Sequence, residues 1–118
     1  MKKHTFIAIL ILVPNIVFAG EWYAIGDVKI NEKTIENKLW RYLYKNSPVK
    51  FKPRQMYSYQ YMKENSNSIY INAFCNIWNR KKLNKELQIV EDGGSCYFGI
   101  NYNLKTGQFY KLNINGEA

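Results

Sequence analysis

The sequence predicts an α+β domain in which one helix packs on a mostly antiparallel sheet of about four strands. Two patterns predict it. Apolar residues recur at helical spacing through residues 32–46, and from residue 57 onward apolar and polar residues alternate with period two. A helix of this length can cover one face of such a sheet, which gives a two-layer arrangement.

The first 19 residues have the order of a bacterial secretory signal peptide. Lys2 and Lys3 form a short basic start, and an apolar run extends through residues 6–18. Val17 and Ala19 have the small side chains that a signal peptidase accepts before the cut. A retained membrane anchor is the alternative. The apolar run is, however, shorter than the roughly 20 apolar residues of a spanning helix. We therefore expect cleavage after Ala19, export to the periplasm or the exterior, and no membrane anchor after cleavage.

Cleavage also changes the composition of the chain. Removing 19 of 118 residues leaves 99, which suits a single domain at 20–118. Two lysines leave with the signal peptide, so the net charge falls from +8 to +6. The only histidine, His4, is lost as well.

The helix is predicted over residues 32–46. Asn31 suits the N-cap position, and Leu39 and Leu43 belong to an apolar stripe at helical spacing. Pro48 ends the helix because the residue before a proline is pushed out of the helical region.

The strands are predicted from alternation and from the turn segments between them. Residues 20–30 could be extended. A polar segment at 63–68 separates two alternating runs, which indicates a β-hairpin. Residues 79–86 are a basic loop, and adjacent glycines at 93 and 94 suggest a tight turn or bulge. The four predicted strands cover residues 57–62, 69–77, 87–103 with an interruption at 91–95, and 109–114.

Cys75 and Cys96 are the only cysteines, and we predict a disulfide between them. Two cysteines in an exported protein usually pair. Closing a loop of this length is worth about 3 kcal/mol in the chain-entropy model. A reactive thiol is the alternative, but the mature chain has no histidine to activate it.

Most catalytic machinery has no support in this sequence. Without histidine the usual base of a nucleophilic triad is missing, and two cysteines cannot make a structural zinc site. Glu91 and Asp92 are the only neighbouring carboxylates. We interpret Asp92 and Gly93 as turn residues, with a catalytic carboxylate as the alternative. We expect no cofactor, no metal and no enzymatic activity.

A cluster of basic residues in the 79–86 loop is a candidate anion-binding site. A positive surface attracts polyanions such as envelope phosphates or acidic glycans, whereas a solvated surface is the plainer interpretation. No nucleic-acid-binding motif is present, and we expect no nucleic acid partner. The cluster consists of Arg80, Lys81, Lys82 and Lys85.

A row of tyrosines at period two admits two interpretations. Tyr57, Tyr59 and Tyr61 share one face of a predicted strand. Such a row more often packs against a helix. If it faces outward, it is a candidate aromatic binding face, because tyrosine combines an apolar ring with a polar end.

The order of one helix followed by an antiparallel meander resembles the cystatin-like arrangement. The segment Gln88-Ile89-Val90-Glu91-Asp92-Gly93 is similar to the glutamine-x-valine-x-glycine loop of cystatin protease inhibitors, with the glycine one position late. The resemblance implies one helix across a sheet. The C-terminal third, residues 92–118, is similar to the ending of small uncharacterised exported bacterial proteins, which implies no activity.

Two classes of function follow from these features. The first is a non-catalytic binding or inhibitory module of the bacterial envelope or exterior, with another protein or an anionic envelope component as partner. The alternative is a small envelope hydrolase that uses carboxylates with tyrosine or lysine. A concave pocket that holds Glu91 or Asp92 with a second carboxylate would favour the enzyme.

Overall fold

The structure is a computed structural model that describes residues 20–116. The predicted signal peptide, residues 1–19, lies outside the described residues. Within residues 20–116, none of the helices is long and apolar enough to cross a membrane. This part of the chain folds as an α+β structure, with one α-helix and one five-stranded sheet, so the predicted class is confirmed.

The predicted helix is α1 (Glu32–Asn46) and has the predicted bounds. Asn31 caps it, because its Oδ1 accepts a hydrogen bond from the Thr34 amide at 3.1 Å. At the other end the Ser47 amide donates to the Leu43 carbonyl, and the chain becomes extended before Pro48. The side of α1 that is buried carries Ile35, Glu36, Leu39, Trp40 and Leu43.

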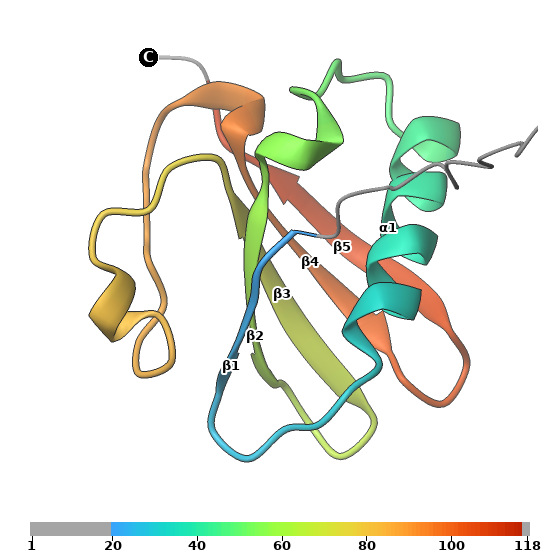
Figure 1. The fold of residues 1–118 in the computed structure, drawn as a ribbon. Coiled ribbons are helices and arrows are strands. Elements are labelled where there is room, and N and C mark those ends of the chain that lie inside the picture. Colours follow the sequence, from blue (N-terminus) through green and yellow to red (C-terminus); the bar gives the residue numbers. More distant parts are fainter. Residues whose placement is uncertain (1–19, 117–118) are drawn as a thin grey trace, which may run out of the picture.

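The sheet has one strand more than the sequence predicts. Its order is β1 (Trp22–Ile25), β2 (Ser58–Lys63), β3 (Ser68–Phe74), β4 (Tyr97–Asn103) and β5 (Gln108–Ile114). Strands β2 to β5 pair antiparallel, as predicted, whereas β1 runs parallel to β2 (Figure 1). Parallel neighbours need a crossover connection, and here α1 lies between β1 and β2 in the chain.

Two predicted strand boundaries are wrong. β3 ends at Phe74 rather than at residue 77, and residues 87–90 form no strand. The backbone of Gln88 is bonded to side chains instead of to a neighbouring strand. Its amide donates to Gln60 Oε1 at 2.8 Å, and its carbonyl accepts from Asn72 Nδ2 at 3.0 Å. These bonds replace the ladder that the apolar pattern predicted.

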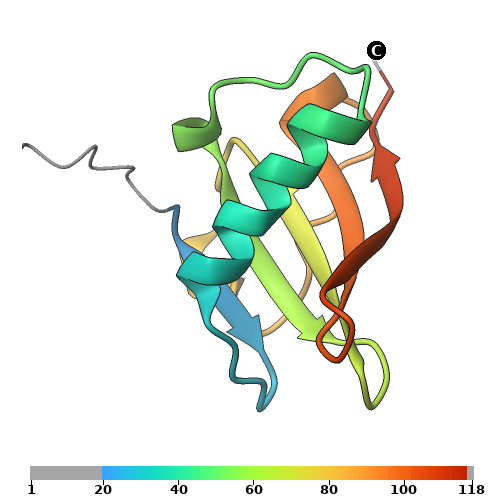
Figure 2. The ribbon, with the colours of Figure 1, turned by 90° about the vertical axis from the view of Figure 1, so that its right-hand side faces the viewer.

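The core lies between α1 and one face of the sheet (Figure 2). Leu39 and Leu43 of α1 pack there against Ile71 and Ile100 of the central strands. Most of the other buried core residues are aromatic. They are Trp40, Tyr57, Tyr59, Tyr61, Phe98 and Tyr102.

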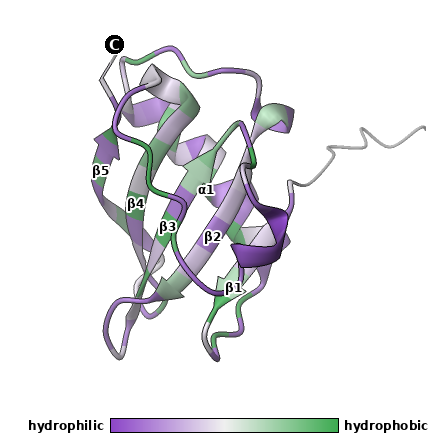
Figure 3. Cartoon of the chain, turned by 90° about the vertical axis from the view of Figure 1, so that its left-hand side faces the viewer, coloured by the Kyte–Doolittle hydropathy of each residue, from purple (hydrophilic) through white to green (hydrophobic). Residues whose placement is uncertain are grey.

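A long loop covers the other face of the sheet, the side from which Figure 3 is drawn. We call residues 75–96, between β3 and β4, the disulfide loop. Its two ends are joined by the Cys75–Cys96 disulfide, with the Cα atoms 5.2 Å apart, so the predicted pairing is confirmed. The Cys75 amide also donates to the Cys96 carbonyl at 3.0 Å. The loop therefore leaves and re-enters the sheet at one point.

Candidate functional site

The tyrosine row is part of the core and does not form an exposed binding face. Tyr57, Tyr59 and Tyr61 are all buried. The Trp40 indole donates to the Tyr59 hydroxyl at 2.7 Å, and the Tyr61 hydroxyl donates to a Glu32 carboxylate oxygen at 2.6 Å. Because both the rings and the polar ends are satisfied inside the protein, the outward-facing interpretation is wrong.

Acidic side chains neutralise half of the basic cluster predicted at residues 80–85. Arg80 forms an ion pair with Glu21 at 2.7 Å, and Lys82 forms one with Glu86 at 3.6 Å. The hydrogen bond from Arg80 lowers the pKa of the Glu21 carboxyl. Glu21 is distant in the sequence, so this partner could not be predicted. Two members of the cluster form no ion pair within the described part of the chain: Lys81 and Lys85.

The two carboxylates considered for catalysis, Glu91 and Asp92, are exposed near the end of the disulfide loop. The Asp92 carbonyl accepts a hydrogen bond from Asn115 Nδ2 at 3.0 Å. Gly93 then takes a left-handed φ of +94°, which glycine adopts without strain. Neither carboxylate lines a cavity described below. Their surroundings favour the turn interpretation.

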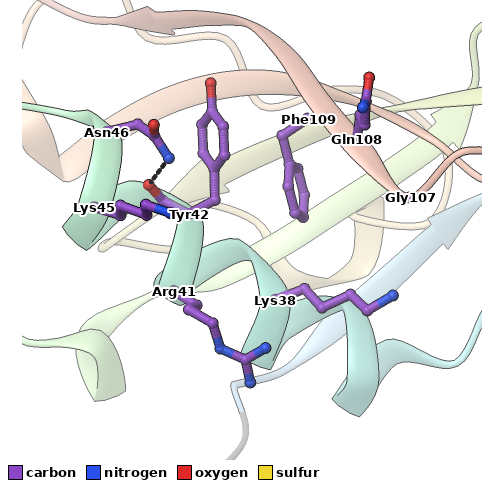
Figure 4. A pocket seen from close by; sticks show the side chains of 8 residues that line it. All are labelled: Lys38, Arg41, Tyr42, Lys45, Asn46, Gly107, Gln108 and Phe109. Carbon is purple, nitrogen blue, oxygen red and sulfur yellow. Dashed lines mark hydrogen bonds between the residues drawn. The ribbon is translucent and has the colours of Figure 1, made fainter.

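A basic groove lies between α1 and the start of β5. Its volume is about 490 Å³, and it is open to solvent. Figure 4 shows the residues that line it, five from the middle and end of α1 and three from the β4–β5 turn and the first residues of β5. We call this the α1–β5 groove. Its lining residues are Lys38, Arg41, Tyr42, Lys45, Asn46, Gly107, Gln108 and Phe109.

The local sequence explains both walls of the α1–β5 groove. Lys38, Arg41 and Lys45 are three, four and seven positions apart, so they share one side of the helix beside the buried stripe. On the other wall, Gly107 ends the β4–β5 turn with φ of +73°, and its amide donates to the Asn103 carbonyl at 2.7 Å. This tight turn brings the start of β5 next to the helix.

Aromatic rings give the α1–β5 groove an apolar surface. The rings of Tyr42 and Phe109 lie across the helix–strand boundary with centroids 5.3 Å apart. Behind them, Tyr102 packs on Phe109 at 4.5 Å. Both Tyr42 and Phe109 are half-buried, so each has a supported ring with one part in solvent. Such rings can pack against the apolar or planar part of a ligand.

The charges of the α1–β5 groove are of one sign. Three of its eight lining residues are cations and none is a carboxylate. Lys38, Arg41 and Lys45 take part in no ion pair within residues 20–116. Like charges at these helical spacings repel each other. An anion in the groove would relieve that repulsion. The groove could not be predicted from the sequence because its two walls are far apart in the chain.

A second exposed feature is the outer surface of the disulfide loop. Trp78 is 64% exposed and Ile89 is 73% exposed, and both line a hollow of about 260 Å³. The loop beneath them is well anchored. The side-chain amide of Gln88 accepts from the Trp78 amide at 3.0 Å and donates to the Asn76 carbonyl at 2.7 Å.

No protein-family model, curated protein or solved structure matches this chain. The cystatin-like resemblance therefore stays a prediction. The structure shares with that arrangement a helix across one face of a sheet, and it differs in its parallel β1. The segment at residues 88–93 lies in the disulfide loop.

Proposed function

We propose that this protein is an exported, non-catalytic binding module that holds an anionic component of the bacterial envelope or exterior in the α1–β5 groove. The observation that carries the proposal is the set of three cations without a carboxylate beside two half-buried aromatic rings. Export is inferred from the signal-like residues 1–19, and the Cys75–Cys96 disulfide fits an oxidising compartment.

The chemistry of the groove favours phosphate-bearing ligands. The Arg41 guanidinium has a planar set of donors that can bind two oxygens of one phosphate, whereas Lys38 and Lys45 act as point charges. Tyr42 and Phe109 add an apolar contact at the same place. A phosphate-bearing wall polymer and an anionic phospholipid headgroup share this chemistry, so both sources are compared in the test.

The test removes the charge of the groove and leaves its shape. In the triple variant Lys38→Gln, Arg41→Gln and Lys45→Gln, helix propensity is kept because glutamine is a good helix former. We expect its affinity for a phosphate polymer at low salt to fall at least about ten-fold, equivalent to about 1.4 kcal/mol. The salt dependence of binding should also flatten, because fewer cations contact the ligand.

The control variant has the same loss of charge on the disulfide loop: Lys81→Gln, Lys82→Gln and Lys85→Gln. It should bind within about three-fold of the unaltered protein, since long-range charge mainly affects encounter. Both variants are measured on the soluble polymer and on vesicles of anionic phospholipid. Equal losses in the two variants would contradict a specific groove, and a loss confined to the vesicles would identify the lipid as the source.

The exposed apolar pair on the disulfide loop favours a second candidate, a binding or inhibitory contact with another protein. Large apolar side chains such as Trp78 and Ile89 are typical anchors of protein interfaces. A photo-crosslinking side chain at Ile89 of the exported protein should then give one defined adduct. The same probe at the exposed Gln55 should give none. Equal adducts from both positions would contradict this candidate.

A further inference from the structure

Glu36 is a carboxylate buried beneath the start of the described chain. It is 0% exposed, and its two oxygens have different partners. Oε2 accepts from Nε and Nη2 of Arg54, at 3.1 and 3.0 Å. Oε1 accepts from the Trp22 indole at 2.8 Å and from the backbone nitrogen of Gly20 at 2.9 Å. The Arg54 guanidinium therefore contacts only Oε2 of Glu36. Oε1 has two uncharged donors instead, the Trp22 indole and the Gly20 nitrogen.

The atoms around Gly20 leave no room for a side chain at this position. A Cβ atom there would lie 2.5 Å from the Tyr57 carbonyl oxygen and 2.8 Å from Cε2 of Tyr59. The residues before a signal-peptide cut must be small, but that requirement falls on Val17 and Ala19 and not on Gly20. The absence of a side chain at position 20 is therefore explained by the close packing of Tyr57 and Tyr59 against the Gly20 backbone.

These observations meet at the predicted cleavage site. Hydrolysis of the Ala19–Gly20 peptide bond adds one water, leaving a carboxylate on Ala19 and an α-ammonium group on Gly20. We propose that this cleavage completes a buried ion-pair site, in which the new α-ammonium of Gly20 becomes the charged partner of Glu36 Oε1. The inference rests on the export part of the proposed function and is independent of the α1–β5 groove.

The site would couple maturation to stability. Figure 2 shows β1, which follows Gly20, beside the first turns of α1, and β1 is an edge strand with only β2 as neighbour. In the uncleaved chain the Gly20 nitrogen is a neutral amide donor. After cleavage it is a cation held to the helix, and a charged hydrogen bond is stronger than a neutral one. The folded state is then stabilised further only in the processed protein.

The pH dependence of this effect has a definite sign. The titratable or charged groups around Gly20 are Glu36 from α1, Arg54 from the short 3-10 helix at Arg54–Met56, and the buried Tyr59 phenol from β2. Pairing with Glu36 raises the folded pKa of the α-amino group above its ordinary value of about 7.7–8.0. The added stability is then complete below about pH 7.7 and is lost as the pH rises through the folded pKa.

The test compares chains whose first residue is defined in vitro. One form begins at Gly20 after removal of a tag, and the other keeps Ala19 in front of it. The pKa of the terminal amine is read from its pH-dependent NMR shift. We expect the Gly20 amine to titrate at least about one unit above the Ala19 amine, a ten-fold change in the protonation equilibrium. At pH 6–7 the Gly20 form should melt roughly 5–10 °C higher.

Glu36→Gln supplies the control, because it keeps the shape of the side chain and removes its charge. On this background the two forms should melt together, and the Gly20 amine should titrate normally. If Glu36→Gln does not fold, the comparison of the two native-sequence forms still decides. An ordinary pKa for the Gly20 amine and equal melting temperatures at pH 6–7 would overturn the inference.

The inference and the proposed function fail in distinguishable ways. The mass of the exported protein reports the cleavage site, and a product that begins elsewhere than Gly20 would overturn the inference in the cell. Binding of phosphate polymers reports the α1–β5 groove alone. Loss of that binding would leave the amine pKa and the melting difference unchanged.

Discussion

Gln60 is the residue on which the packing of the disulfide loop most directly depends. Its side chain is 0% exposed and uses both ends of its amide. Nε2 donates to the carbonyls of Leu83 and Glu86 at 2.9 and 2.7 Å, and Oε1 accepts from the Gln88 amide at 2.8 Å. One side chain of β2 thus satisfies three backbone groups of a loop that has no strand pairing.

Replacing Gln60 should release this part of the loop. In Gln60→Leu the two carbonyls and one amide lose their partner, at about 1–3 kcal/mol for each group left buried and unsatisfied. We expect a lower free energy of unfolding in urea and faster hydrogen exchange at residue 88. Gln55→Leu is the matched control, because it makes the same chemical change at an exposed position. Equal effects of the two substitutions would contradict the role of Gln60.

At the scale of elements, sequence patterns predicted the helix and the hairpin that form between residues close together in the chain. The helical period and the Asn31 cap determine α1, and the polar turn between two alternating runs determines the β2–β3 hairpin. β1 could not be recognised as a strand of the sheet, because it has four residues and pairs with a strand beyond the helix. The apolar residues at 87–90 wrongly predicted a strand. The Gln88 backbone is hydrogen-bonded to the side chains of Gln60 and Asn72 and not to a neighbouring strand.

The tyrosines of and before β2 should resist alkaline titration. Burial raises the pKa of Tyr57, Tyr59 and Tyr61 above the value of about 10 found in an unfolded chain. The stability that depends on these neutral phenols is complete below pH 10. It is lost above that, because the unfolded chain then releases phenolic protons that the folded protein retains.

Phenolate absorbance and circular dichroism measured together against pH would check this prediction. A fraction of the ten tyrosines should ionise only as the circular dichroism signal of the fold is lost. Titration of every tyrosine near pH 10 with the fold intact would show that the row is accessible to solvent.

At the scale of the whole molecule, the structure brings together residues that no local pattern connects. The α1–β5 groove joins the middle and end of the helix to a turn near the end of the chain. In the same way, the ion pair between Glu21 and Arg80 joins the residue before β1 to the disulfide loop. The sequence could predict a positive charge overall, but which cations remain without acidic partners depends on these long-range contacts.

The disulfide is the one long-range contact that the count of cysteines predicted. Its removal should destabilise the protein mainly by increasing the conformational entropy of the unfolded chain. Cys75→Ser with Cys96→Ser opens a loop with a sequence separation of 21 residues. We expect the free energy of unfolding to fall by about 3 kcal/mol. Because the disulfide loop lies on the face opposite α1, the oxidised protein and the variant should bind a phosphate polymer alike where both are folded. A large loss of binding by the folded variant would contradict this separation.

The central claim is that an anion is held in the α1–β5 groove, and mapping of backbone amide shifts tests it most directly. A soluble phosphate polymer is titrated into the isotopically labelled protein. We predict the largest shifts at residues 38–46 and 107–109, with half-saturation at the same concentration for both segments, and their loss in the Lys38→Gln, Arg41→Gln, Lys45→Gln variant. Largest shifts at residues 79–86, retained in that variant, would contradict the account.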